Sequence, residues 1–186
     1  MGLDPPPDGV TEVVSAAEIE ARVTELGEAI TADYHGRRPV LVAVLVGALP
    51  FLADLVRRIE IPCEVDFLSI SRFGEGGRLR LVLDTAEDLN GRDVILVEDI
   101  VDTGLTLSTL RRMLIDRGTA SLATVALIDK TTRRLVEVPL EYRGFEVGDE
   151  YLIGYGLDHR GLYRNLRSLW AVLDRNRLES RFRLPV

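Results

Sequence analysis

The pattern of hydrophobic and polar positions divides the chain into alternating strands and helices. A continuous apolar run, rich in β-branched residues, covers residues 40–46 and is typical of a strand buried on both faces. Shorter apolar or alternating runs predict further strands at about 64–71, 79–84, 94–97, 122–128, 141–145 and 151–155. Strands that alternate with helices indicate an α/β fold, in which a mainly parallel sheet is flanked by helices.

The helices have recognisable ends. Ser15 and Glu18 have the spacing of a capping box and predict a helix from there to about Tyr34. Further helices are expected at about 50–59, with Pro50 in the first turn, and at about 104–116, ending before Gly118. Between two of the strands, residues 72–78 predict a Gly-rich mobile loop.

Length and composition narrow the class of protein. A chain of 186 residues, 46% of them hydrophobic, is expected to form a single domain over 1–186, with a loose lead-in at 1–10 and a polar tail at about 174–186. The net charge of −7 argues against a nucleic-acid partner. The sole cysteine indicates a reducing compartment, and no apolar run is long enough for a membrane span or typical of a signal peptide. We therefore expect a cytoplasmic protein without a membrane partner.

The segment at 94–110, VILVEDIVDTGLTLSTL, carries the most informative chemistry. A hydrophobic strand leads into Glu98 and Asp99, and a short Asp-Thr-Gly loop then precedes a helix. A strand, a tight loop and a helix start together form an anion site, while the paired acids suit a sugar diol or a metal ion. The same residues would also suit a turn that merely caps the helix.

This segment resembles the phosphoribosyl pyrophosphate signature of the type I phosphoribosyltransferases, and the order of the other segments resembles the hypoxanthine–guanine branch of that family. The resemblance extends from about Val14 to Leu173. It implies a Rossmann-like core with a small hood built from terminal segments. It also implies a homodimer or homotetramer and Mg²⁺ as the cofactor.

The resemblance assigns roles to the signature. Glu98 and Asp99 would accept hydrogen bonds from the ribose hydroxyls, and both are also candidate metal ligands. Asp102 would act as general acid/base near N7 of the purine. The 5-phosphate would be held by the residues of the loop and the helix start: Asp102, Thr103, Gly104, Leu105 and Thr106.

The base site is expected after the strand at 122–128 and around 151–158. Lys130 is the only lysine among 23 basic residues, and a lysine here would donate to the 6-oxo group of the base. Tyr151 would stack on the purine, the Leu152 backbone would contact its edge, and Asp158 would bind Mg²⁺ near the base and pyrophosphate. Taken singly, these residues would equally suit a surface lysine, a core aromatic and a surface acid.

The remaining candidates concern pyrophosphate and closure. Val46, Gly47 and Arg164 would bind pyrophosphate, although Val46 stands where the family commonly has lysine, which removes a side-chain charge. Arg134 is a weaker candidate that would also suit a solvated charge. The lid over the reacting centre would comprise Ser71, Arg72, Phe73 and Gly74, a segment that would serve equally as a hairpin loop.

The resemblance therefore implies purine salvage. The chain would transfer 5-phosphoribosyl from phosphoribosyl pyrophosphate to N9 of hypoxanthine or guanine, giving IMP or GMP and pyrophosphate. Two alternatives stay open: a regulator of the same fold that senses phosphoribosyl pyrophosphate, and a xanthine-preferring transferase. The sequence does not rank the three 6-oxopurines.

Overall fold

The computed structural model describes residues 9–73 and 78–174 of the chain. Its centre is a six-stranded sheet in the order β4-β3-β2-β5-β6-β7. β4 runs antiparallel to β3, and all other neighbours are parallel. The strands are β2 (Val40–Leu45), β3 (Glu64–Phe73), β4 (Arg78–Leu83), β5 (Asp93–Val101), β6 (Ser121–Asp129) and β7 (Tyr142–Glu146).

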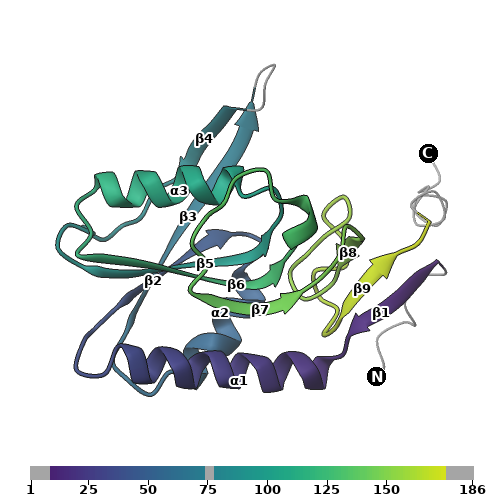
Figure 1. The fold of residues 1–186 in the computed structure, drawn as a ribbon, viewed down its shortest axis with the longest axis horizontal. Coiled ribbons are helices and arrows are strands. Elements are labelled where there is room, and N and C mark those ends of the chain that lie inside the picture. The colour runs from purple at the N-terminus through teal and green to yellow at the C-terminus, as the bar shows by residue number, and fades with distance from the viewer. Residues whose placement is uncertain (1–8, 74–77, 175–186) are drawn as a thin grey trace.

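Helices cover both faces of this sheet (Figure 1). α1 (Ala16–Asp33) and α2 (Leu49–Leu55) lie on one face, and α3 (Leu105–Asp116) lies on the other. The apolar side chains of β2 alternate between the two, since Leu41 and Ala43 pack with α1 and α2 whereas Val40, Val42 and Val44 pack with α3. This two-sided burial explains why the central strands read as continuous apolar runs.

The start of α1 confirms the predicted capping box. The Ser15 hydroxyl accepts from the Glu18 amide at 3.3 Å, and the Glu18 carboxylate accepts from the Ser15 amide at 2.8 Å. Pro50 lies in the first turn of α2, as predicted. That α-helix is shorter than expected, because the chain continues from it as a 3₁₀ turn at Val56–Arg58. None of the helices in residues 9–73 and 78–174 has the length and apolar character needed to cross a membrane.

A second, three-stranded sheet forms the hood. It has the order β1-β9-β8, with β1 at Val10–Val14, β8 at Tyr151–Ile153 and β9 at Leu169–Val172. Both pairings are antiparallel, and the pairing of β1 with β9 joins segments from opposite ends of the chain, as Figure 1 shows. The α/β fold and the hood built from terminal segments are therefore confirmed, whereas β1 and β9 were not predicted as strands.

Several boundaries differ from the expected ones. β5 extends to Val101, so Glu98 and Asp99 lie inside the strand rather than after it. The reason is that β6 continues beside it and pairs Ile100 with Ile128. β3 and β4 likewise extend into the expected loop, so that Arg72, Phe73 and Arg78 belong to strands.

Candidate active site

Strands β5, β6 and β7 of the central sheet point toward the hood (Figure 1). Ligands of such sheets bind beyond the carboxyl ends of the strands. Three described segments carry predicted site residues to this edge: the turn after β2, the turn between β5 and α3, and the turn after β6. The segment that follows β8 faces them from the hood.

Glu98 and Asp99 occupy surroundings that oppose their ionisation. Glu98 is only 6% exposed, and burial, reinforced by the charge of Asp99, raises the pKa of its carboxyl well above the usual range. Burial also raises the pKa of Asp99, to about 6, although the Ile100 amide donates to its Oδ1 at 2.8 Å. Charges of Arg164 and Asp158 also act on this pKa, so the hood segment reaches the end of β5.

The turn between β5 and α3 has a left-handed residue at its centre. Gly104 caps the helix with φ of +83°, and its carbonyl accepts from the Ser108 amide at 2.8 Å. A Cβ at this position would lie 2.4 Å from the Val136 carbonyl oxygen. Glycine is therefore required by both the backbone conformation and the neighbouring segment. Thr103 precedes this glycine and Thr106 follows it in the first turn of the helix, and their role in a phosphate loop stays a prediction.

The turn after β2 packs directly against the paired acids. The peptide bond between Leu45 and Val46 is cis, and the Val46 side chain is exposed. A Cβ on Gly47 would lie 1.6 Å from Asp99 Oδ2, and a Cβ on Gly156 would lie 2.0 Å from the Gly47 carbonyl oxygen. Glycines therefore allow the turn, the acid and the hood segment to meet.

Lys130 lies at the carboxyl end of β6 and is only 7% exposed. Its Nζ donates to the Glu150 carbonyl at 2.5 Å. Burial lowers the pKa of its ammonium group, and the negative charge of Asp102 partly offsets that effect. Asp102 itself is half-exposed, and its Oδ1 accepts from Arg133 Nε at 2.6 Å. The predicted base-reading lysine and the predicted acid/base residue are thus neighbours.

Asp158 and Arg164 form an ion pair in the hood. Arg164 Nη2 lies 2.7 Å from Asp158 Oδ1, and its Nη1 donates to the Gly156 carbonyl at 2.5 Å. The Gly161 amide donates to the other oxygen of Asp158 at 2.6 Å. Two residues predicted to serve metal and pyrophosphate therefore hold each other in the ligand-free protein.

Tyr151 and Leu152 lie on β8. The Tyr151 hydroxyl donates to the Asp158 carbonyl at 2.9 Å, and its ring meets that of His159 edge to face at 5.8 Å between centroids. Leu152 is buried. His159 was not among the predicted residues, although it directly follows Asp158.

The predicted lid is described only in part. Ser71 is exposed and Arg72 and Phe73 belong to the end of β3, whereas Gly74 lies outside the described residues. The role of this segment as a lid stays a prediction.

Sequence reasoning missed the charged residues that support the site. Arg134 was a weak candidate for binding pyrophosphate or for a solvated charge, but its side chain is only 11% exposed and pairs with the fully buried Asp129. The solvated-charge reading is therefore wrong. The signal was present, because an acid and two arginines flank Lys130 in IDKTTRR, but the sequence does not show which of these charges pair.

Comparison with known proteins identifies the family. The model of the phosphoribosyl transferase domain matches residues 9–160. The chain belongs to this family. It is 44% identical over 170 residues to the hypoxanthine phosphoribosyltransferase of Salmonella typhimurium, covering 88% of this chain and 96% of that protein. It is 41% identical over 158 residues to the hypoxanthine-guanine phosphoribosyltransferase of Lactococcus lactis, covering 83% and 86%.

Solved structures agree with this membership. A hypoxanthine-guanine phosphoribosyltransferase from Bacillus anthracis superposes on this phosphoribosyltransferase with a TM-score of 0.84 and 37% identity, covering 87% of this chain and 98% of that one. A hypoxanthine phosphoribosyl transferase from Trypanosoma cruzi gives a TM-score of 0.86 at 37% identity, covering 92% and 94%. The fold is therefore that of the type I phosphoribosyltransferases.

Proposed function

We propose that this phosphoribosyltransferase moves the 5-phosphoribosyl group of phosphoribosyl pyrophosphate to N9 of hypoxanthine or guanine, with release of pyrophosphate. The observation that carries the proposal is that buried Lys130 lies beside Asp102. Asp102 directly follows β5, the strand that contains the paired acids Glu98 and Asp99. A cation able to donate to a base and carboxylates able to accept from a sugar thus lie at one edge of the sheet. The relatives of this chain that act on hypoxanthine support the same substrate class.

The base would be selected by the ammonium group of Lys130. A donor at this place favours a 6-oxo group and disfavours a 6-amino group, which would leave two donors facing each other. The Glu150 carbonyl fixes the direction of the ammonium, and its two remaining protons are available to a ligand. Tyr151 would stack on the purine, and the backbone at Leu152 would contact its edge.

The sugar phosphate would lie across the turn between β5 and α3. Glu98 and Asp99 would accept from the ribose hydroxyls, while the amides from Asp102 to Thr106 and the hydroxyls of Thr103 and Thr106 would hold the 5-phosphate. Asp102 would exchange the purine proton at N7. In the free protein its carboxylate is paired with Arg133, so this arginine would yield its hydrogen bond when the base arrives.

Pyrophosphate would lie between the turn after β2 and the hood. The backbone of Val46 and Gly47 and the guanidinium of Arg164 would bind it, because a planar fork suits phosphate oxygens. Arg164 would then exchange part of its pairing with Asp158 for the ligand. The apolar side chain of Val46 adds no charge, so Arg164 would carry more of the binding.

The carboxylates of this edge fit Mg²⁺. Asp99 and Asp158 offer hard oxygen ligands, and the charge of Asp158 raises the pKa of Asp99. No group of three or more candidate metal ligands occurs in the described parts of the chain. Mg²⁺ is commonly held by one or two carboxylates together with substrate phosphates, which matches this donor set. Bound there, with Glu98 as a further candidate ligand, the ion would stabilise the negative charge of the leaving pyrophosphate.

A nucleotide-formation assay tests the proposal. The purified protein is incubated with Mg²⁺, phosphoribosyl pyrophosphate and either hypoxanthine, guanine, xanthine or adenine, and the nucleoside monophosphate is measured. We expect activity with hypoxanthine or guanine and little with adenine. A preference for adenine contradicts the role of Lys130, and binding of phosphoribosyl pyrophosphate without turnover of any base contradicts the enzymatic function.

We further propose that the protein acts in the cytoplasm as a homodimer or homotetramer. The lone cysteine, Cys63, supports a reducing compartment, since no intrachain disulfide can form. The oligomeric state rests on the resemblance to the family. Sedimentation equilibrium of the purified protein measures it directly.

A further inference from the structure

The segment after β6 and the turn after β5 are joined by backbone hydrogen bonds. The Lys130 amide donates to the Val101 carbonyl at 2.9 Å, and the Leu135 and Val136 amides donate to the Thr103 carbonyl at 3.0 and 3.2 Å. The missing side chain of Gly104 lets the second segment approach this closely. The lysine proposed to read the base and the loop proposed to hold the phosphate are therefore parts of one unit.

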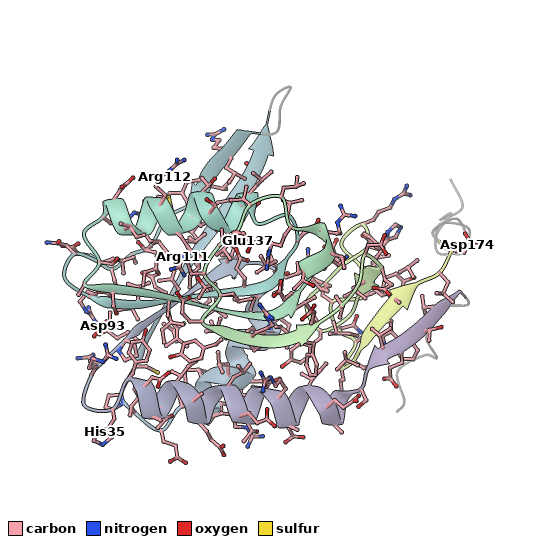
Figure 2. The ribbon with its side chains drawn as sticks, in the orientation of Figure 1. His35, Asp93, Arg111, Arg112, Glu137 and Asp174 are labelled. Carbon is pink, nitrogen blue, oxygen red and sulfur yellow. The ribbon has the colours of Figure 1, made fainter. Side chains whose placement is uncertain are left out.

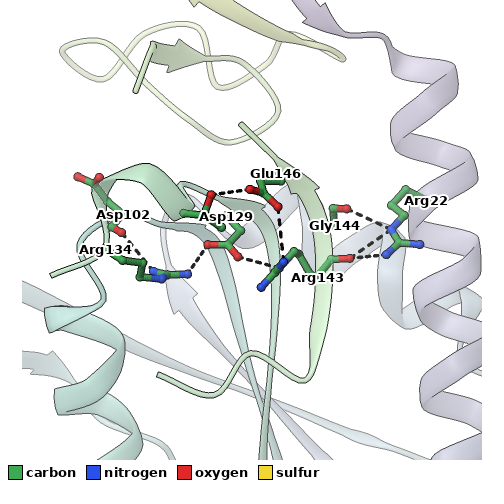
Figure 3. Close-up of polar contacts among 8 residues, drawn as sticks. Arg22, Asp102, Asp129, Arg134, Arg143, Gly144 and Glu146 are labelled. Atoms are coloured by element: carbon green, nitrogen blue, oxygen red, sulfur yellow. Dashed lines mark hydrogen bonds and ion pairs between the residues drawn. The ribbon is translucent and has the colours of Figure 1, made fainter. Parts of the chain in front are cut away.

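Arg134 bridges the two segments with its side chain. Its Nη1 donates to the Asp102 carbonyl at 3.1 Å, and its Nη2 pairs with Asp129 Oδ1 (Figure 3). Asp129 has no exposed surface and directly precedes Lys130 in the chain. One guanidinium thus connects the residue before the base-reading lysine with the backbone of the proposed acid/base residue.

A second arginine holds Asp129 from the other side. Arg143 Nε lies 2.7 Å from Asp129 Oδ2, as an ion pair rather than an aligned hydrogen bond. Arg143 belongs to β7, and its carbonyl accepts from Arg22 Nη2 of α1 at 2.6 Å (Figure 3). The carboxylate between the two segments is therefore anchored to the sheet and, through it, to the helix on one face.

Such a network is a costly way to stabilise a fold. Each ion removed from water carries a desolvation penalty, and apolar residues of similar volume often stabilise a core as well or better. What charged, forked contacts supply instead is a fixed geometry. Catalysis is sensitive to displacements of about 1 Å between reacting groups, so a fixed geometry matters at this place.

We propose that Arg134, held by Asp129, is a positioning residue that sets the spacing between Asp102 and Lys130. The proposal rests on the proposed function, in which these two groups act on N7 and on the 6-oxo group of one base. In this role Arg134 acts through the Asp102 carbonyl and not by contact with a substrate. It therefore tunes how the base is bound and protonated, and not how the 5-phosphate is held, because the backbone bonds to Thr103 remain without it.

The variant Arg134→Lys distinguishes a role of Arg134 in positioning Asp102 from a role in the stability of the fold. A lysine retains a charge for Asp129 but lacks the second arm that reaches the Asp102 carbonyl. We expect kcat/KM for hypoxanthine to fall about 10- to 100-fold, with a lower kcat and a higher KM for the base. The KM for phosphoribosyl pyrophosphate should change less than about threefold. Kinetics equal to those of the unmodified protein, or an equal loss for both substrates, would overturn the proposal.

Arg111→Lys is the matched control. Arg111 is also 11% exposed, pairs with Glu141 at 3.0 Å and donates to Thr124 Oγ1 at 2.6 Å. It reaches from α3 to the amino-terminal half of β6, away from the candidate site (Figure 2). Glu141 is more exposed than Asp129, so this ion pair is less buried than that of Arg134. Weakening the contacts of Arg111 should lower the unfolding temperature without changing the KM for the base. A matching kinetic loss in this variant would reduce the role of Arg134 to stability and overturn the proposal.

Amide hydrogen exchange gives a readout that does not need turnover. In ligand-free Arg134→Lys, amides of 101–103 and 129–134 should exchange faster, whereas those of Leu135 and Val136, which donate to the Thr103 carbonyl, and those of α1 and β2 should be unchanged. Unchanged exchange in both segments would overturn the positioning role while leaving the proposed function intact. A different outcome is that the unmodified protein forms no nucleotide while the exchange in Arg134→Lys changes as expected. The proposed function would then be wrong, and Arg134 would connect the two segments without positioning groups for catalysis.

Discussion

At the scale of single residues, the paired acids Glu98 and Asp99 oppose the stability of the fold. Burial raises the pKa of both carboxyls, and the charge of Asp99 raises that of Glu98 further. A charge held in such surroundings costs free energy unless a partner compensates it. In the proposed function, a ribose diol or Mg²⁺ would supply that compensation, so ligand binding would relieve the cost of burying these two carboxylates.

Asp99→Asn should therefore stabilise the protein near neutral pH. The pKa of Asp99 is about 6 in the folded state and about 3.9 in an unfolded chain. A raised folded pKa means that stability is lost as the pH rises through 6, and that loss is absent below about pH 4. We expect the variant to gain about 1–3 kcal/mol in the free energy of unfolding at pH 8, and the gain to vanish near pH 4. Urea unfolding at both pH values measures it.

Glu28→Gln is a suitable control for this pH experiment, because Glu28 is exposed on α1. Removing that charge should leave the free energy of unfolding within about 0.5 kcal/mol at either pH. A loss of stability in Asp99→Asn at pH 8 would mean that this carboxylate is compensated within the free protein. The idea of a strained ribose site would then be wrong.

Lys130→Arg should impair use of the base. The lysine is buried and donates to the Glu150 carbonyl, so a longer, planar guanidinium cannot take the same place. Losing a charged hydrogen bond of about 1.5–3 kcal/mol raises the KM for hypoxanthine about tenfold to a hundredfold. Arg112→Lys on the outer face of α3 is the control, with no expected effect (Figure 2). An unchanged KM in Lys130→Arg would make the sole lysine a coincidence of composition.

At the scale of elements, the turn between β5 and α3 requires glycine for two separate reasons. Gly104 has φ of +83°, and its missing Cβ leaves room for the Val136 carbonyl. Gly36 has a similar φ of +76° but open space around it. The two positions therefore separate the cost of the backbone conformation from the cost of crowding.

Gly36→Ala and Gly104→Ala should differ in both stability and binding. We expect a loss of about 1–2 kcal/mol at Gly36, from the left-handed conformation alone. At Gly104 crowding adds to this, giving about 2–4 kcal/mol. Only Gly104→Ala should also weaken binding of phosphoribosyl pyrophosphate, as measured by titration calorimetry. Equal losses of stability and unchanged binding in both variants would show that the approach of Val136 has no role in shaping the phosphate loop.

The elements that the sequence predicted well are those whose pattern depends on local burial. β2 and β6 are both buried along most of their length. β2 is apolar at every position, and β6 is apolar from Leu122 to Ile128 except at Thr124, so both runs are easily recognised in the sequence. β1 and β9 pair across almost the whole chain, and β1 has three exposed residues among five. When a strand forms because of a partner far away in the sequence, its own residues show only a weak strand pattern.

In the candidate site, too, local features were predicted from the sequence and contacts between distant residues were not. The signature at 98–106 and the isolated Lys130 predicted which residues gather at the edge of the sheet. The pairing of Arg164 with Asp158 and of Arg133 with Asp102 was not predicted. In a chain with so many arginines, partners are chosen by three-dimensional proximity, which residue order alone does not encode.

At the scale of the whole molecule, the candidate site is divided between two sheets. The central sheet supplies Glu98, Asp99 and Asp102 from β5 and its turn, and the segment after β8 supplies Asp158 and Arg164. The hood is itself closed by β1 and β9 from the two ends of the chain. A ligand that contacts both halves therefore stabilises the connection between the hood and the sheet.

Mg²⁺ and phosphoribosyl pyrophosphate should consequently stabilise the protein together more than the sum of their separate effects. In the described residues, Asp158 is engaged by Arg164 and Gly161, and no group of three metal ligands is preformed, so Mg²⁺ alone should shift the unfolding temperature little. With both ligands present at concentrations about 100-fold above Kd, the free energy of unfolding should rise by about 2.7 kcal/mol. For a chain of this size, that corresponds to a rise of roughly 5–10 °C in the unfolding temperature. Differential scanning fluorimetry with each component alone, with both, and with both plus excess EDTA measures the coupling.

Asp158→Asn should retain the shift given by phosphoribosyl pyrophosphate alone and lose the additional one. A large shift with Mg²⁺ alone would indicate instead that the protein holds the ion before its substrate arrives.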